Sequence, residues 1–269
     1  MREMAAMILA HTGEGVSIVL WDRRNSGGKS GVCFDDELSL RHYEMEVQAT
    51  DLFVLLSKVK LLPCALFGNS SGARLQLLFA ALFPDAVRGL ICLNISAGPR
   101  AAEVLSGTYY GQHVSNISRR GKRGILECKF YSKMAAHNPD TAKQLEAAEE
   151  GLILDYMKRN KEYLAAQGDA EAFPALGVTR SQIESTLHST LVLHNYGEGD
   201  CDGVHALAAS ERVAKLMRNA ALVASTDSNV WFPALMAFVE RLRVQKRIDD
   251  EEAGICSPRL TLDEDLDEE

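Results

Sequence analysis

The order of apolar and amphipathic stretches predicts a layered protein built of strands and helices. Short apolar runs, typical of buried strands, occur at Val16–Leu20, Cys64–Phe67, Gly89–Asn94, Ser189–Asn195 and Ala220–Ser225. Helical patterns lie around them, at Met1–Thr12, Glu37–Lys60, the stretch from Ser71 to Leu82, Ala206–Met217 and Trp231–Lys246. The alternation predicts an α/β fold, a mostly parallel sheet flanked by helices.

The pattern changes between residues 97 and 186, where no strand-like run occurs and helical patterns dominate, as in Asp140–Leu164. We therefore expect residues 1–96 and 187–248 to form the α/β core and residues 97–186 to be a helical insertion. Residues 249–269 hold ten carboxylates against one arginine, which predicts an acidic disordered tail. A length of 269 residues suits one domain with a sizeable insertion, or two small domains.

The clearest motif is Gly68-Asn69-Ser70-Ser71-Gly72, between the run Cys64–Phe67 and an apolar helical pattern. It fits G-x-S-x-G, the nucleophile elbow, in which a serine occupies a strained turn between a strand and a helix. We expect Ser70 to be the nucleophile and the Ser71 N–H to point at an oxyanion, with both glycines needed for close approach of the backbone. The alternative is a plain turn with a serine N-cap, which leaves the paired glycines unexplained.

This stretch resembles the α/β-hydrolase superfamily, and the resemblance covers about residues 1–246. The loop from Asp22 to Ser30 is similar to the D-x-R-x-x-G-x-S loop after the fourth strand of that fold, with one extra residue. The resemblance implies that residues 97–186 are a lid. Tyr109 and Tyr110 either line a pocket beneath this lid or pack on its surface, and surface packing is the expectation we prefer.

The resemblance also implies an acid in the loop after Ser189–Asn195. Asp202 is favoured by the run Asp202-Gly203-Val204-His205, which looks like the D-x-V-H segment of the family. Counting three residues from Gly197 favours Asp200 instead, and Glu198 is a third alternative.

The catalytic base of this family should follow the last strand, but residues 225–231 read STDSNVW and contain no histidine. Asp227 is a carboxylate and a weak base for a serine hydroxyl. His205 and His194 are the nearest substitutes. The resemblance implies packing beside the acid loop for His205, so we expect neither histidine to replace the base, although His205 stays among the candidate catalytic residues.

The first three strands and the His-Gly loop of the family have no counterpart in the sequence. We expect either a truncated copy of a longer hydrolase or a catalytically degenerate member. Missing strands would expose a sheet edge beside Val16–Leu20, which favours pairing with a second copy of the chain and a homo-oligomer.

Composition narrows the possible partners. The net charge of −8 comes from the tail, since the other 248 residues sum to about +1, which argues against nucleic-acid binding. No apolar run reaches the length of a membrane span, and no signal-peptide layout is present. The six cysteines are widely spaced without zinc-type pairs, and we expect Cys64 and Cys92 to be core residues. We expect a cytoplasmic protein without metal or cofactor.

Two functions follow from these observations. The first is an esterase-like serine hydrolase of a small acyl substrate, with Ser70 as nucleophile and Asp202 or Asp200 as the acid. The second is a degenerate hydrolase-fold protein that binds a ligand or a protein partner. The missing histidine favours the second function, whereas the elbow and the acid loop favour the first, toward which we lean.

Overall fold

The computed structural model describes residues 2–13, 16–26, 30–196 and 203–252. The chain forms two compact units. The larger unit runs from Asp22 to Trp231, and the smaller unit joins residues 1–21 to residues 232–269. The candidate site described below lies entirely in the larger unit.

The larger unit is built on a parallel sheet of four strands in the order β1-β2-β3-β4. The strands are β1 (Cys64–Asn69), β2 (Val87–Leu93), β3 (Ser189–His194) and β4 (Ala220–Ala224). Phe67 is paired with Ile91 and Ile91 with Leu191, so central positions of β2 and β3 have a neighbour on both sides. β2 and β3 are almost wholly buried, as expected of inner parallel strands. The predicted α/β fold with a mostly parallel sheet is confirmed.

Helices cover this sheet. α4 (Ser71–Leu82) packs against β1, β2 and α3 (Glu44–Lys58), and a 3₁₀ turn, η1 (Pro84–Ala86), leads from α4 into β2. α12 (Leu207–Leu216) packs against β3 and β4, and the short α11 (Arg180–Glu184) contacts α4 and α12. Because all four strands are parallel, their carboxyl ends lie at one edge of the sheet, where β1 leads directly into α4.

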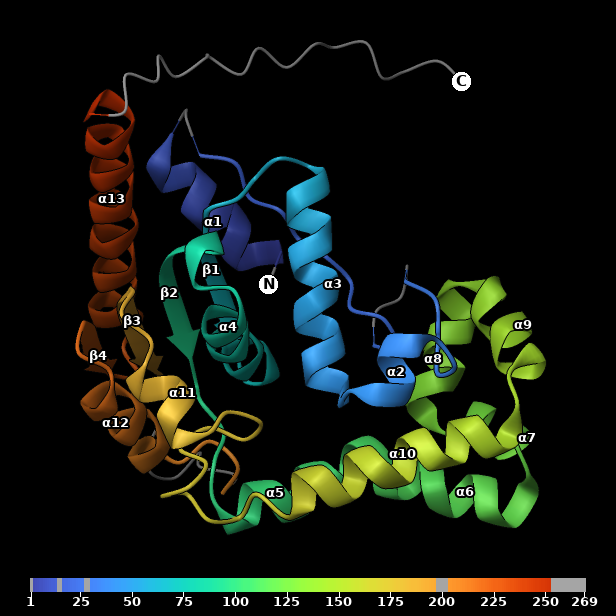
Figure 1. Cartoon of the computed structure of the whole chain (residues 1–269). Coiled ribbons are helices and arrows are strands. Elements are labelled where there is room, and N and C mark those ends of the chain that lie inside the picture. The colour runs from blue at the N-terminus through green and yellow to red at the C-terminus, as the bar shows by residue number, and fades with distance from the viewer. Residues whose placement is uncertain (1, 14–15, 27–29, 197–202, 253–269) are drawn as a thin grey trace, which may run out of the picture. The chain divides into compact units, whose positions relative to one another are not determined.

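Between β2 and β3 the described chain is mostly helical (Figure 1), and its residues contribute most of a hydrophobic cluster. Besides α11, the elements are α5 (Pro99–Ser106), the π-helical turn η2 (Gly107–Gly111), α6 (Gln112–Arg120), α7 (Arg123–Leu126), α8 (Lys129–His137), α9 (Pro139–Ala147) and α10 (Glu150–Ala165). α10 packs along α5, η2 and α6. Val32 and Phe34 join this core from the loop that follows residue 22, so that loop is fixed against the helical segment.

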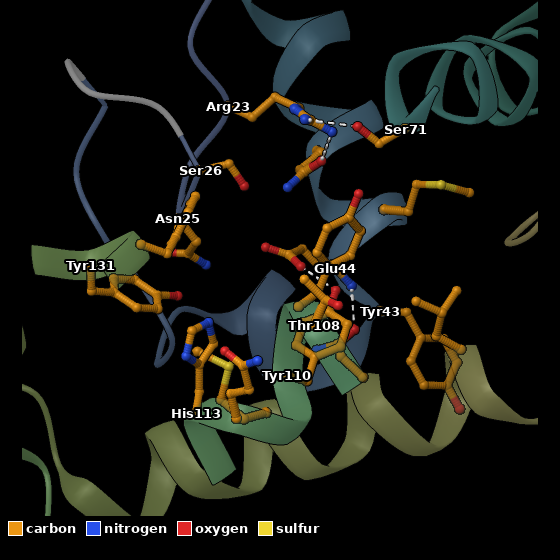
Figure 2. Close-up of a pocket in the computed structure, with 18 of the residues that line it drawn as sticks. Arg23, Asn25, Ser26, Tyr43, Glu44, Ser71, Thr108, Tyr110, His113 and Tyr131 are labelled. Carbon is orange, nitrogen blue, oxygen red and sulfur yellow. Dashed lines mark hydrogen bonds between the residues drawn. The ribbon is translucent and has the colours of Figure 1, made fainter. Parts of the chain in front are cut away.

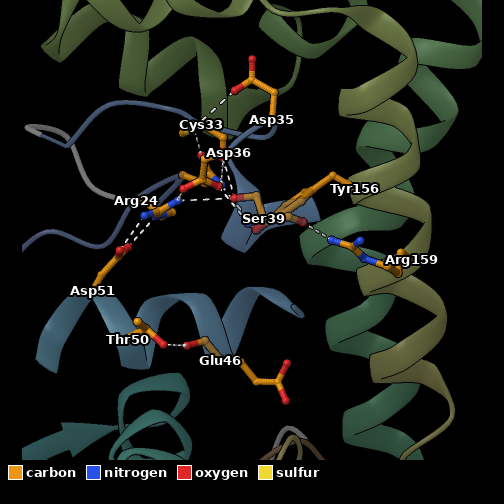
Figure 3. Close-up of polar contacts among 11 residues, drawn as sticks. Arg24, Cys33, Asp35, Asp36, Ser39, Glu46, Thr50, Asp51, Tyr156 and Arg159 are labelled. Carbon is orange, nitrogen blue, oxygen red and sulfur yellow. Dashed lines mark hydrogen bonds and ion pairs between the residues drawn. The ribbon is translucent and has the colours of Figure 1, made fainter. Parts of the chain in front are cut away.

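Residues 22–26 and 30–36, called the anchored loop below, precede α2 (Glu37–Arg41) and are held by the guanidinium of Arg24 (Figure 3). It donates two hydrogen bonds of 2.5 Å to Asp51 on α3 and one of 2.6 Å to Asp36. Burial alone would lower the pKa of Arg24, but the two carboxylates outweigh that effect and raise it. Asn25, in a left-handed conformation, braces the loop through both backbone groups of Cys33.

The smaller unit contains α1 (Arg2–Thr12) and most of α13 (Ser228–Glu252), which begins in the larger unit. The ring of His11 meets Phe232 edge-on at 4.8 Å. Arg243 Nη1 donates to the carbonyl of Thr12 at 3.0 Å, which caps the end of α1.

Two elements expected from the sequence differ in the structure. Val16–Leu20 forms no strand, and Val19 and Leu20 are exposed. An apolar run becomes a strand only where a neighbouring strand satisfies its backbone, and periodicity does not report such a partner. The outer strand at this end of the described sheet is therefore β1. The predicted tail is wrong at its start, since α13 continues to Glu252, and residues 253–269 lie outside the described residues.

Two predicted helices are each divided. Glu37–Lys60 is split between α2 and α3, because the Glu46 carboxylate accepts the Tyr43 N–H at the start of α3. Arg159 of α10 also binds the carbonyls at the end of α2, at 2.5 Å for Leu40. Asp140–Leu164 is split between α9 and α10, where Lys122 donates to the Ala148 carbonyl. Distant cations thus end helices that the local pattern would continue.

Candidate active site

Ser70 occupies a strained turn between β1 and α4. Its backbone angles are φ 54° and ψ −113°, a region that residues with a side chain rarely adopt. The turn is held by the Ser70 N–H, which donates to the Leu93 carbonyl at 2.9 Å. A Cβ on Gly68 would lie 2.2 Å from the Gly72 carbonyl oxygen, so Gly68 is required for this close approach. The strand, turn and helix are arranged as the elbow motif predicts.

The expected need for a second glycine is wrong for Gly72. A Cβ at that position would meet nothing within 4 Å, because Gly72 already belongs to the first turn of α4. Close backbone approach therefore explains Gly68 and leaves Gly72 unexplained. Ser71 is the first residue of α4, so its N–H has no acceptor within the helix and is available to an anion.

His205 lies against Ser70, although the family resemblance implies a packing role for it. Its Nε2 atom is 2.7 Å from Ser70 Oγ, within hydrogen-bond distance. The residue comes just before α12, and its ring is buried and stacks on Tyr196 at 5.3 Å. The structure thus brings this histidine to the serine, a contact that the sequence did not predict.

The other expected site residues divide into two groups. Asp202, Asp200 and the alternative Glu198 lie outside the described residues, so their roles stay predictions. His194 is buried at the end of β3, with Nδ1 3.4 Å from Ser210 Oγ. Burial, followed by the neighbouring His205, lowers its pKa.

The asparagine of the elbow belongs to a group of amides at the carboxyl ends of three strands. Asn94, also at positive φ, donates from Nδ2 to Asn69 Oδ1 at 3.3 Å and to Asn195 Oδ1 at 2.8 Å. The Asn195 N–H donates back to Asn94 at 3.1 Å. These bonds tie the end of β1 to the loops after β2 and β3, beside the turn that carries Ser70.

A cavity of about 500 Å³ opens beside the elbow, within the larger unit (Figure 2). Ser71 and Arg74 line it from α4, Glu44 from α3 and Arg23 from the anchored loop. Arg23 donates to Ser71 Oγ at 3.1 Å and to Gln48 at 3.3 Å. The remaining wall comes largely from the helical segment and includes Tyr109, Tyr110, His113, Phe130 and Tyr131. The two tyrosines expected to pack on the surface thus lie at this wall, on the π-helical turn.

The cavity wall contains buried polar groups without partners. Arg74 is 4% exposed; Nη1 donates to the Leu176 carbonyl at 3.3 Å, while Nε is buried with no hydrogen-bond partner. His113 is equally buried, its Nδ1 has no partner, and burial lowers its pKa to about 4. Glu44 accepts a hydrogen bond from Tyr110, and burial raises the pKa of its carboxyl.

No group of three or more metal-ligating side chains occurs within the described residues. Cys33, Cys64, Cys92 and Cys128 are free thiols; Cys92 is buried as expected, whereas Cys64 is only half-buried. Among the helices described, none is both long and apolar enough to cross a bilayer.

Sequence reasoning missed the charged residues of the cavity wall. Arg74 was detectable in principle, because it is a cation within an otherwise apolar helix, between Ala73 and Leu75. Nothing local marks Glu44 or His113, since their burial depends on elements far away in sequence.

Comparison with known proteins supports the fold. No protein-family model and no curated protein sequence matches the chain. MGS-M2, an α/β-hydrolase enzyme from a Medee basin deep-sea metagenome library, is similar in structure with a TM-score of 0.53 and 17% identity, over 89% of this chain and 84% of that one. A hydrolase from Pseudomonas aeruginosa PA01 has a TM-score of 0.51 and 21% identity, over 89% of this chain and 84% of that one. The esterase RhEst1 from Rhodococcus sp. ECU1013 has a TM-score of 0.51 and 17% identity, over 88% of this chain and 84% of that one. With the parallel sheet and the serine turn described above, these similarities show that the chain has the fold of the α/β-hydrolase superfamily.

Proposed function

We propose that the protein is an esterase-like serine hydrolase of a small acyl substrate, with Ser70 as nucleophile and His205 as general base. The observation that carries the proposal is the 2.7 Å contact between Ser70 Oγ and His205 Nε2, made by a serine held at positive φ. A serine hydroxyl is a weak nucleophile until a neighbouring base accepts its proton, and an imidazole at this distance meets that requirement.

The chemistry follows from this pair. The Ser70 hydroxyl gives its proton to neutral Nε2 of His205 while Oγ bonds to the ester carbonyl carbon, and the carbonyl electron pair moves to oxygen. The Ser71 N–H at the start of α4 donates to that oxyanion. When the intermediate collapses, the alcohol leaves with the proton from His205. Water, deprotonated by the same imidazole, then releases the acid from Ser70.

The imidazole needs a group that orients it. We assign this role to Asp202 or, failing that, Asp200, both in the loop that precedes His205. In this arrangement the acid and the base come from one loop. Residues 225–231, where the family places its base, then have no catalytic part to play. The lid role of residues 97–186, the homo-oligomer and the cytoplasmic location likewise remain predictions.

A fluorophosphonate probe tests the proposal, because it labels only activated serines. We expect labelling of the wild type, none of Ser70→Ala, and retained labelling of Ser71→Ala. His205→Gln should reduce labelling and hydrolysis of 4-nitrophenyl acetate by about 10²–10⁴-fold. His137→Gln, which changes an exposed histidine, is the matched control and should behave as wild type.

The alternative function, a degenerate hydrolase-fold protein that binds without catalysis, is favoured by the absence of a histidine from residues 225–231. It predicts no labelling of the folded wild type. Labelling that survives in His205→Gln would instead show that the serine is activated by another group.

A further inference from the structure

We propose that the cavity beside Ser71 binds the carboxylate of an acidic ligand through Arg23 and Arg74, so that the preferred substrates are esters carrying a second, acidic group. As a statement about substrates, this inference rests on the proposed function. As a statement about binding, it rests on the cavity alone.

The first observation is the unpaired charge of Arg74. Among the described residues, neither Arg74 nor Arg23 forms an ion pair with a carboxylate. Burial of a guanidinium without an anion is costly, and it lowers the pKa of Arg74. A planar guanidinium with free N–H groups matches a carboxylate, which can accept two hydrogen bonds from it.

The second observation is the balance of charge around the cavity. Four cationic side chains line it, and the exposed Lys129 and Lys133 on α8 add to the two arginines. The carboxylate among the lining residues is Glu44; burial raises the pKa of its carboxyl, and the charges of Arg23 and Arg74 act in the opposite direction without reversing that shift. His113 is uncharged at neutral pH because its pKa is lowered to about 4. The excess of positive charge favours an anionic ligand over a neutral one or a cation.

The shape and the other wall residues limit the ligand further. About 500 Å³ is enough for a small organic molecule. Aromatic rings line the wall, contributed by Tyr43, Tyr109, Tyr110, Phe130, Tyr131 and Tyr163. Figure 2 shows Glu44 between Arg23 and Ser71 on one side and Tyr110 and His113 on the other. A flat, unsaturated body bearing a carboxylate suits such a wall.

The position of Ser71 connects this cavity to the proposed chemistry. Ser71 lines the cavity and receives a hydrogen bond from Arg23, while its neighbour Ser70 contacts His205. Consecutive Cα atoms are about 3.8 Å apart. Ser70 itself does not line the cavity, so the substrate in this inference binds its acidic group at the arginines and passes Ser71 to bring its ester to the Ser70 hydroxyl.

Binding is tested by isothermal titration calorimetry at pH 7 with benzoate, which joins a carboxylate to a flat ring, and with benzamide, its neutral counterpart. We expect wild type to bind benzoate at least tenfold more tightly than benzamide. Arg23→Gln and Arg74→Gln should each lower the benzoate affinity at least tenfold, and Arg119→Gln, at an exposed site on α6, should leave it unchanged. If the buried Arg74 variant fails to fold, Arg23→Gln decides. Equal affinity for the two probes, or undiminished benzoate binding by Arg23→Gln, overturns the inference.

Substrate preference is tested by the ratio of kcat/KM for mono-4-nitrophenyl glutarate to that for 4-nitrophenyl butyrate. We expect a ratio of ten or more for wild type and for Arg119→Gln, and a fall toward one in Arg23→Gln through a higher KM for the acidic ester. Ser70-dependent hydrolysis of both esters at equal efficiency overturns the inference and leaves the proposed function standing. If neither ester is hydrolysed, the proposed function fails, and the benzoate titration still decides the binding site.

Discussion

The serine turn and the neighbouring cavity meet at Ser71, yet they are built in opposite ways. Five consecutive residues make the turn, and steric contact within the backbone fixes its shape, as the 2.2 Å approach at Gly68 shows. The cavity is assembled from side chains of the anchored loop, α3, α4 and the helical segment. The conformation of Ser70 is thus set locally, whereas the cavity and the contact between Ser70 and His205 depend on residues that the fold brings together from distant parts of the chain.

The largest expected effect separates the two glycines of the turn. Gly68→Ala forces a Cβ against the backbone of Gly72 and Ala73, so we expect the free energy of unfolding to fall by about 2–4 kcal/mol. We also expect the labelling of Ser70 to be lost. Gly72→Ala has open space and should be neutral or stabilise by up to about 1 kcal/mol. Urea unfolding followed by tryptophan fluorescence measures both. Equal effects of the two substitutions would contradict a turn fixed by this one approach.

A smaller effect on stability is expected from Arg24→Gln, which changes the anchored loop at the cavity wall. Arg24→Gln removes charged hydrogen bonds to Asp51 and Asp36 and should cost about 1–3 kcal/mol. Arg23 is the residue next to Arg24, so a loosened loop should also misplace Arg23 and lower the affinity for benzoate. Labelling of Ser70 should persist. Arg41→Gln breaks an exposed ion pair with Glu37 and should change stability little. Unchanged benzoate binding in a folded Arg24→Gln would show that the loop does not position Arg23.

The same ion pairs give a pH dependence. Burial alone would raise the pKa of Asp36, but hydrogen bonds from Arg24 and Ser39 lower it below its ordinary 3.8. An acid with a lowered folded-state pKa contributes stability above its unfolded pKa and loses it as the pH falls through the folded value. The stability difference between wild type and Asp36→Asn, measured by urea unfolding, should therefore be full at pH 6 and decline below about pH 4. A difference that does not vary with pH would contradict this assignment.

The smallest expected effect concerns Glu44, whose carboxyl has its pKa raised above 4.5 by burial. The folded protein then holds this proton more tightly than the unfolded chain, so ionisation at higher pH weakens folding. Thermal unfolding of Glu44→Gln should match wild type near pH 4 and exceed it increasingly toward pH 7. Glu103→Gln, at an exposed position on α5, should show no such trend. If the wild type instead becomes more stable than Glu44→Gln as the pH rises, the ionised carboxylate is stabilised by the arginines.

What the sequence could predict follows the same division. The turn at Ser70 and the four strands of the described sheet were predictable from glycine spacing and apolar runs, whereas the same reasoning wrongly predicted a strand at Val16–Leu20. The contact between His205 and Ser70 spans 135 positions and has no local signal. The break before α3 depends on Arg159, 117 residues beyond His42. The unpaired state of Arg74 likewise depends on which carboxylates the fold brings near it.

The position of His205 ahead of α12 has a consequence for how the chain tolerates change. In the proposed pair, the proton acceptor is encoded before β4 and α13 rather than after them. Changes beyond Ser225 would then remove neither member of that pair, in contrast to a hydrolase whose histidine follows the last strand. The changes that α13 tolerates are those at its exposed positions, because Leu235 and Phe238 of that helix are buried.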